Sequence, residues 1–120
     1  MATILIVEDE VFVRQSAEWI IEDIGYDALA AEDLGQALVY LAGSGQIDAL
    51  FVDIRLNTIL LGGYDVANQA IGLRPGLPVL YTSGSPLSGA MTSRFVEGGR
   101  FLQKPYSPSQ LGASLEQLFP

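Results

Sequence analysis

Four apolar runs in this sequence end in side chains that can do chemistry. The acids Glu8 and Asp9 follow the first run and Asp53 ends the second, while the hydroxyl of Thr82 ends the third. The fourth run ends at Lys104, the only lysine of the chain, directly before a proline. The carboxyl ends of parallel strands meet at one edge of a sheet, where ligands bind. We therefore expect three acids, a hydroxyl and an ammonium group to converge on one small site.

The chemistry of such a site follows from its charges. Crowded carboxylates raise one another's pKa unless a cation neutralises them, and an all-oxygen donor set suits a hard ion, Mg²⁺ or Mn²⁺. A metal, an ammonium group and a hydroxyl can surround the oxygens of a phosphoryl group, and a carboxylate can accept that group as an acyl phosphate. Asp53 stands alone at its strand end and is the best candidate acceptor, whereas Glu8 and Asp9 suit the metal.

The composition excludes several classes of function. The 120 residues include no cysteine and no histidine, which rules out disulfides, thiolate or imidazole metal sites and histidine bases. The net charge of −8 disfavours direct binding to nucleic acid or to anionic membranes. No stretch is long and apolar enough to span a bilayer. We expect a cytoplasmic protein.

The elements that must position these residues alternate regularly along the chain. We expect strands at Thr3–Val7, Tyr26–Ala31, Ala49–Asp53, Val79–Thr82 and Arg100–Gln103, and helices at Val11–Ile24, Leu34–Ala42, Tyr64–Leu73, Ser88–Val96 and Pro108–Leu118. Right-handed crossovers give an α/β, doubly wound parallel sheet, for which we predict the flavodoxin-like order 2-1-3-4-5. Residues 1–120 are expected to form one domain without an output domain.

The pattern of acids, hydroxyl and lysine at these four strand ends resembles that of the receiver domain of two-component response regulators. The resemblance covers the whole chain. The resemblance implies a phosphoacceptor signalling domain, not an enzyme in the ordinary sense. Asp53 would accept a phosphoryl group from the phosphohistidine of a histidine kinase or a histidine phosphotransfer protein, and would lose it to water. Glu8, Asp9, Asp53 and the backbone carbonyl of Arg55 would hold Mg²⁺, or Mn²⁺ in its place.

The same resemblance implies a switch and a docking face. Lys104 would pair with the phosphoryl oxygens, Thr82 would turn inward to bond them, and Phe101 would be the aromatic residue that moves in response. A downstream protein would bind the face made by the fourth helix, the fifth strand and the fifth helix. Candidate contacts on that face are Met91, Arg94, Phe95 and Tyr106. A second copy of the chain is another potential partner.

The segment after Asp53 departs from the family pattern. Receivers commonly carry a proline four residues after the acceptor and a glycine four beyond it, whereas here Asn57 and the later pair Gly62–Gly63 occur. The apolar residues 59–61 either pack on the domain or form a contact for a partner. Arg55 borders the site, and we predict that it controls how water reaches the acyl phosphate.

Three other functions and two structural interpretations compete. A flavodoxin-like FMN binder needs a phosphate loop after the first strand, where this chain has acids. An aspartyl phosphatase usually has a second acid two residues after its nucleophile, at the position of Arg55. A pseudo-receiver would bind partners without phosphorylation, but its acid site should be eroded. Asp9 could instead serve only as an N-cap of the first helix, and Trp19 is expected to be ordinary packing.

Overall fold

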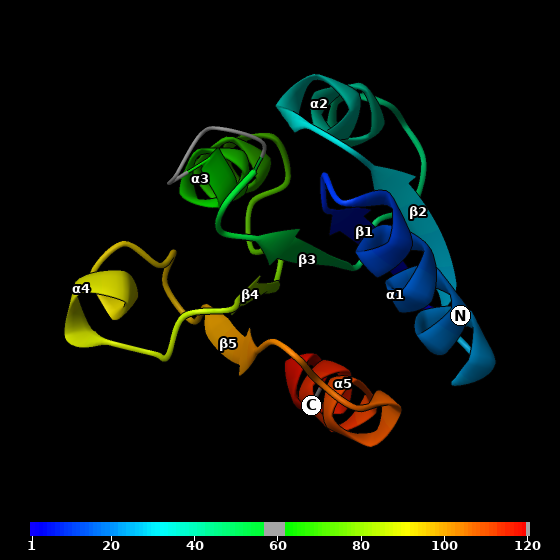
Figure 1. Ribbon diagram of the computed structural model, residues 1–120. Coiled ribbons are helices and arrows are strands. Elements are labelled where there is room, and N and C mark those ends of the chain that lie inside the picture. The colour runs from blue at the N-terminus through cyan, green and yellow to red at the C-terminus, as the bar shows by residue number, and fades with distance from the viewer. Residues whose placement is uncertain (57–61, 120) are drawn as a thin grey trace.

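The computed structural model describes residues 1–56 and 62–119. Five parallel strands form one sheet in the order β2-β1-β3-β4-β5, as predicted (Figure 1). The strands are β1 (Thr3–Val7), β2 (Asp27–Ala31), β3 (Ala49–Asp53), β4 (Val79–Ser83) and β5 (Arg100–Gln103). From β1 the chain first adds β2 on one side and then β3 on the other. The carboxyl ends of β1 and β3 are therefore neighbours.

Helices cover both faces of the sheet. Helices α1 (Val11–Asp23) and α5 (Pro108–Leu118) lie on one face, and α2 (Leu34–Ala42), α3 (Gly62–Leu73) and the short α4 (Gly89–Thr92) lie on the other (Figure 1). Side chains of a strand point alternately to the two faces. Ile4 and Ile6 of β1 therefore pack towards α1 and α5, while Leu5 and Val7 pack towards α2 and α3. Both faces are buried, which explains why the central strands are apolar throughout.

Side-chain caps fix where the helices begin. Asp33 and Ser107 cap α2 and α5 as the sequence predicted, and Ser107 forms a capping box with Gln110. The cap of α1 is Glu10, whose carboxylate accepts hydrogen bonds from the backbone N–H groups of Phe12 and Val13. The alternative that Asp9 is the cap of α1 is therefore wrong, and Asp9 stands one residue before the cap.

The fourth helix is much shorter than predicted. The expected helix at Ser88–Val96 contains only the four helical residues of α4, followed by turns. The hydroxyls of Thr92 and Ser93 donate to carbonyls three residues earlier, a local alternative that weakens helices. The N–H of Val96 donates to the hydroxyl of Tyr81 at 3.0 Å instead of continuing the helix. Tertiary contacts thus end α4 early.

Three further predictions have different outcomes. Trp19 was expected to be packed, but it is 73% exposed on α1, so that prediction is wrong. Helix α3 begins at Gly62, two residues before the predicted start. The apolar residues 59–61 lie outside the described residues. Among the helices within residues 1–56 and 62–119, none has the length and apolar character needed to cross a membrane.

Candidate functional site

Three carboxylates meet where β1 and β3 end side by side. Glu8 follows β1 directly, Asp9 is the next residue, and Asp53 is the last residue of β3. One carboxylate oxygen of each lies within 4.8 Å of those of the other two. Glu8 and Asp53 are buried and Asp9 is partly exposed. The sheet therefore brings together the three acids that the sequence predicted would meet.

The carboxylates lie in a hollow of about 340 Å³ that opens to solvent. Its lining comes from the ends of β1, β3, β4 and β5 and from the start of α1: Glu8, Asp9, Glu10, Val13, Asp53, Arg55, Ser83, Gly84, Ser85 and Lys104. The hollow is large enough for a metal ion and a small anionic group at the same time.

Lys104 joins the acids from the end of β5. Its Nζ lies 2.5 Å from Oε1 of Glu8 and 3.3 Å from Oδ2 of Asp53. The backbone N–H of Lys104 donates to the carbonyl of Ser83, which ties the lysine to the end of β4. Burial lowers the pKa of Lys104, but the hydrogen bond and charge of Glu8, together with the charge of Asp53, outweigh it and leave that pKa raised. The ammonium group therefore stays protonated in the site.

Glu8 is the carboxylate whose protonation is most affected. Burial, aided by the charge of Asp53, raises the pKa of Glu8 from 4.5 to about 7, although Lys104 pulls it in the opposite direction. One ammonium group thus leaves three carboxylates incompletely neutralised. A hard divalent cation with oxygen ligands fits this donor set and this deficit of positive charge.

Asp53 is held by the backbone that follows it. Its Oδ1 accepts a hydrogen bond from the N–H of Arg55 at 3.3 Å. Gly63 packs directly on the end of β3, where its N–H donates to the carbonyl of Ile54 at 2.8 Å. A Cβ at Gly63 would lie 2.2 Å from the carbonyl oxygen of Asp53, so only glycine fits. The displaced glycine pair is visible in the sequence, but its spacing alone does not reveal this contact with β3.

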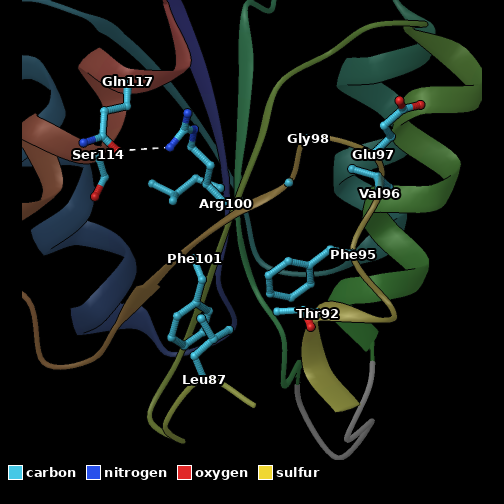
Figure 2. A pocket seen from close by; sticks show the side chains of 12 residues that line it. Leu87, Thr92, Phe95, Val96, Glu97, Gly98, Arg100, Phe101, Ser114 and Gln117 are labelled. Atoms are coloured by element: carbon cyan, nitrogen blue, oxygen red, sulfur yellow. Dashed lines mark hydrogen bonds between the residues drawn. The ribbon is translucent and has the colours of Figure 1, made fainter. Parts of the chain in front are cut away.

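Thr82 and Phe101, the predicted switch pair, lie on β4 and β5. Thr82 is buried and pairs in register with Asp53, and its hydroxyl donates to the carbonyl of Leu102 at 2.7 Å. Phe101 is partly buried, and Figure 2 shows its ring beside that of Phe95, with the centroids 6.4 Å apart. Phe95 also stacks on Tyr81 at 4.2 Å. The hydroxyl of Thr82 is therefore engaged with β5 and not with Asp53.

The remaining predicted residues are divided between two places. Arg55 is exposed at the rim of the hollow. Arg94 is exposed above the ring of Tyr64, and Met91 packs partly against the core. Tyr106 lies elsewhere: its ring packs against Phe51 on the face of the sheet covered by α1 and α5. Burial, followed by the charges of Glu8 and Asp53, raises the pKa of Tyr106 to about 12. Tyr106 thus neighbours the acid site, unlike the other three candidate contacts.

Known proteins resemble the chain over nearly its full length. A family model described as "Response regulator receiver domain" matches residues 4–116. The tetrathionate response regulatory protein TtrR of Salmonella typhimurium is 30% identical over 122 residues, covering 98% of this chain and 56% of that protein. A response regulator receiver protein from Sinorhizobium medicae has a crystal structure with a TM-score of 0.87 at 29% identity, covering 98% of this chain and 93% of its own. The chain spans about half the length of the first curated relatives it matches.

A more distant structure shows the same fold. The chemotaxis protein CheY4 of Vibrio cholerae has a TM-score of 0.88 at 23% identity, and the match covers 99% of both chains. At this identity the likeness concerns the fold alone.

Proposed function

This chain belongs to the response regulator receiver family of two-component signalling, and we propose that it accepts a phosphoryl group on Asp53 in a Mg²⁺-dependent reaction. The donor is a phosphohistidine of a histidine kinase or a histidine phosphotransfer protein. The observation that carries the proposal is the convergence of Glu8, Asp9 and Asp53 within 4.8 Å beside Lys104. The chain then acts as a signalling domain, and its own chemistry is limited to gaining and losing this group.

In the transfer step, a carboxylate oxygen of Asp53 attacks the phosphorus of the phosphohistidine. The new oxygen–phosphorus bond forms as the phosphorus–nitrogen bond breaks, and the imidazole leaves with the electron pair of that bond. Glu8, Asp9, Asp53 and the backbone carbonyl of Arg55 would hold the metal, which would supply positive charge to the carboxylates and to the phosphoryl oxygens. The N–H of Arg55 already orients Oδ1 of Asp53.

Lys104 supplies the second positive charge. Its ammonium group lies between Glu8 and Asp53, so a small rotation of the side chain brings it to a phosphoryl oxygen on Asp53. Charge-assisted hydrogen bonds of this kind are stronger than neutral ones. Lys104 therefore stabilises both the developing charge during transfer and the acyl phosphate afterwards.

The change in binding surface follows from Thr82. To donate to a phosphoryl oxygen, its hydroxyl must leave the carbonyl of Leu102, which releases one side-chain tie between β4 and β5. Phe101 precedes Leu102 on β5, and its ring borders a hollow of about 540 Å³ together with Leu87, Phe95 and Arg100 (Figure 2). A shift of Phe101 reshapes this hollow. The downstream protein recognises the altered face of α4, β5 and α5.

The experiment that tests this function uses acetyl phosphate as a small phosphodonor. Purified protein is incubated with acetyl phosphate and Mg²⁺, and its intact mass is measured. We expect a gain of one phosphoryl group that disappears in the Asp53→Asn variant and when Mg²⁺ is chelated. Asp65→Asn is the matched control, because Asp65 is an exposed acid on α3 that should not affect the mass gain. A wild-type protein that stays unmodified, or an Asp53→Asn protein that gains the same mass, would contradict the proposal.

A further inference from the structure

Arg14 reaches back from α1 to the loop that carries the acid pair. Its Nη1 donates to the backbone carbonyl of Glu8 at 3.0 Å and to that of Asp9 at 3.4 Å. The side chain is partly buried, so these bonds are shielded from water in part. Both of these bonds go to backbone oxygens.

The two carbonyls belong to the peptide groups on either side of Asp9. Because a peptide group is planar, the backbone between two fixed peptide groups has its φ and ψ fixed as well. The direction of the Cα–Cβ bond of Asp9 follows from these two angles. We propose that Arg14 is a positioning residue for the metal site: its guanidinium fixes the peptide groups that flank Asp9 and so aims that carboxylate towards Glu8 and Asp53. This inference rests on the proposed metal-dependent function.

Other bonds of this loop act on different atoms. The N–H of Glu10 donates to Oε2 of Glu8 at 3.2 Å, which orients the side chain of Glu8. The carboxylate of Glu10 caps α1, and the carbonyl of Glu10 accepts from the N–H of Arg14 at 2.9 Å. These bonds fix Glu8 and the start of the helix. Arg14 adds the fixation of the backbone around Asp9, the acid that lies between them.

Positioning and charge make different demands on residue 14. Lysine keeps the positive charge, but its ammonium group stands on a different stem and does not reproduce the position of the Nη1 atom that donates to both carbonyls here. If Arg14 acts by charge alone, Arg14→Lys should bind the metal like the wild type. If it acts by positioning, Arg14→Lys should lose affinity together with Arg14→Gln.

Arg74 offers a matched control in the same chain. Its guanidinium also donates to backbone carbonyls, those of Leu41, Gly43 and Gly45, at 2.9 to 3.0 Å. These bonds tie the end of α3 to the end of α2, and none of the three carbonyls belongs to a residue of the acid hollow. Arg74→Gln therefore removes arginine–carbonyl bonds of the same kind without changing the loop that carries Glu8 and Asp9.

The test measures binding of Mn²⁺ to the full chain by the electron paramagnetic resonance signal of free Mn²⁺. Supporting interactions behind metal ligands typically change affinity by about 10- to 100-fold, so we expect Arg14→Gln and Arg14→Lys to raise the dissociation constant at least about tenfold. Arg74→Gln should keep the wild-type constant even if its stability falls. In phosphorylation by acetyl phosphate, the Mg²⁺ concentration for half-maximal rate should rise in the Arg14 variants, while the rate at saturating Mg²⁺ changes little.

The outcomes separate this inference from the proposed function. An Arg14→Lys protein with the wild-type dissociation constant would overturn the positioning role, and this variant decides the matter if Arg14→Gln does not fold. A tenfold loss shared by Arg74→Gln would overturn it too, since the effect would then be general. If the wild type itself binds no Mn²⁺, the proposed metal site fails, whatever the role of Arg14.

Discussion

The backbone that follows β3 and the backbone that follows β4 are built in opposite ways. After β3, Ile54 and Leu56 are buried, and α3 returns so closely that Gly63 touches the carbonyl of Asp53. After β4, residues 84–90 are all exposed, and the four residues of α4 include none that is buried. The segment that follows Asp53 is thus packed into the core, and the segment that follows β4 lies at the surface.

This difference separates two tasks within one small domain. Asp53, as the proposed phosphoacceptor, needs a fixed position, because transfer depends on alignment with the donor. The region proposed to change shape on phosphorylation needs low local stability, because elements that move are drawn from the less stable parts of a fold. Buried contacts accordingly gather on the β3–α3 side, and exposed polar and glycine residues gather on the β4–α4 side. Substitutions on the two sides should therefore have different effects on stability and on phosphorylation.

The largest effect is expected from Gly63→Ala on the packed side. The added methyl group would meet backbone atoms of Asp53 and Ile54 at 2.2 to 2.8 Å, and backbone cannot move aside as a side chain can. We expect a loss of about 3 kcal/mol in the free energy of unfolding, measured with urea, together with impaired phosphorylation.

The control for this variant lies in the same helix. At Gly72 an added Cβ would find nothing within 4 Å, and alanine favours helices over glycine by about 1 kcal/mol. Gly72→Ala should therefore leave the protein equally or more stable. If Gly63→Ala is as stable as Gly72→Ala, the close packing around Asp53 does not hold the acceptor in place.

A smaller loss is expected from Tyr81→Phe, at the boundary of the exposed side. This change removes the hydroxyl that accepts the N–H of Val96, a buried group that would lose its partner. An unsatisfied buried donor costs about 1–3 kcal/mol. We expect hydrogen exchange at the amide of Val96 to accelerate while phosphorylation of Asp53 persists. Tyr26→Phe, whose ring packs on Phe119, is the control. Unchanged exchange at Val96 would mean that the hydroxyl does not anchor this segment.

The third prediction concerns the pH dependence of stability without metal. Because the pKa of Glu8 is raised from 4.5 to about 7 in the folded protein, the folded state binds this proton more tightly than the unfolded state. The resulting stabilisation is fully present below pH 4.5 and is lost as the pH rises through 7. In Glu8→Gln, the urea midpoint should change less between pH 4.5 and 7 than it does in the wild type. A wild-type slope that survives in Glu8→Gln would assign the effect to another group.

The smallest effect is expected from Arg55→Ala at the rim of the hollow. Arg55 is exposed and lines the site, and we predict that its side chain limits how water reaches an acyl phosphate on Asp53. We expect the dephosphorylation rate, followed by intact mass after removal of the phosphodonor, to rise a few-fold, equivalent to about 1 kcal/mol or less of barrier height. An unchanged rate would remove Arg55 from this role. Arg94→Ala, at an exposed residue that does not line the hollow, provides the comparison.

The convergence of the acids followed from general rules of parallel sheets. Apolar runs with polar ends located the strands, and the order 2-1-3-4-5 then required Glu8 and Asp53 to meet. Caps at Asp33 and Ser107 could also be recognised, because the signal lies within a few adjacent residues. Local and topological rules were sufficient for these features.

Other features depended on contacts between distant segments. The bond from Val96 to Tyr81 ends the fourth helix early, and the contact of Gly63 with Asp53 joins residues ten positions apart. The exposure of Trp19 depends on which face of α1 remains uncovered by α5 and the sheet. Periodicity alone determines none of these, since each depends on how complete elements pack.

The position of Trp19 has a practical consequence. It is the single tryptophan of the chain, and its indole is largely open to water on the outside of α1, beside Pro108 at the start of α5. Indole emission shifts with hydration, so ultraviolet fluorescence gives a built-in, label-free signal for any protein that comes to cover this helix. Ion binding at the carboxylates should leave the same signal nearly unaltered, which allows the two events to be followed separately in one cuvette.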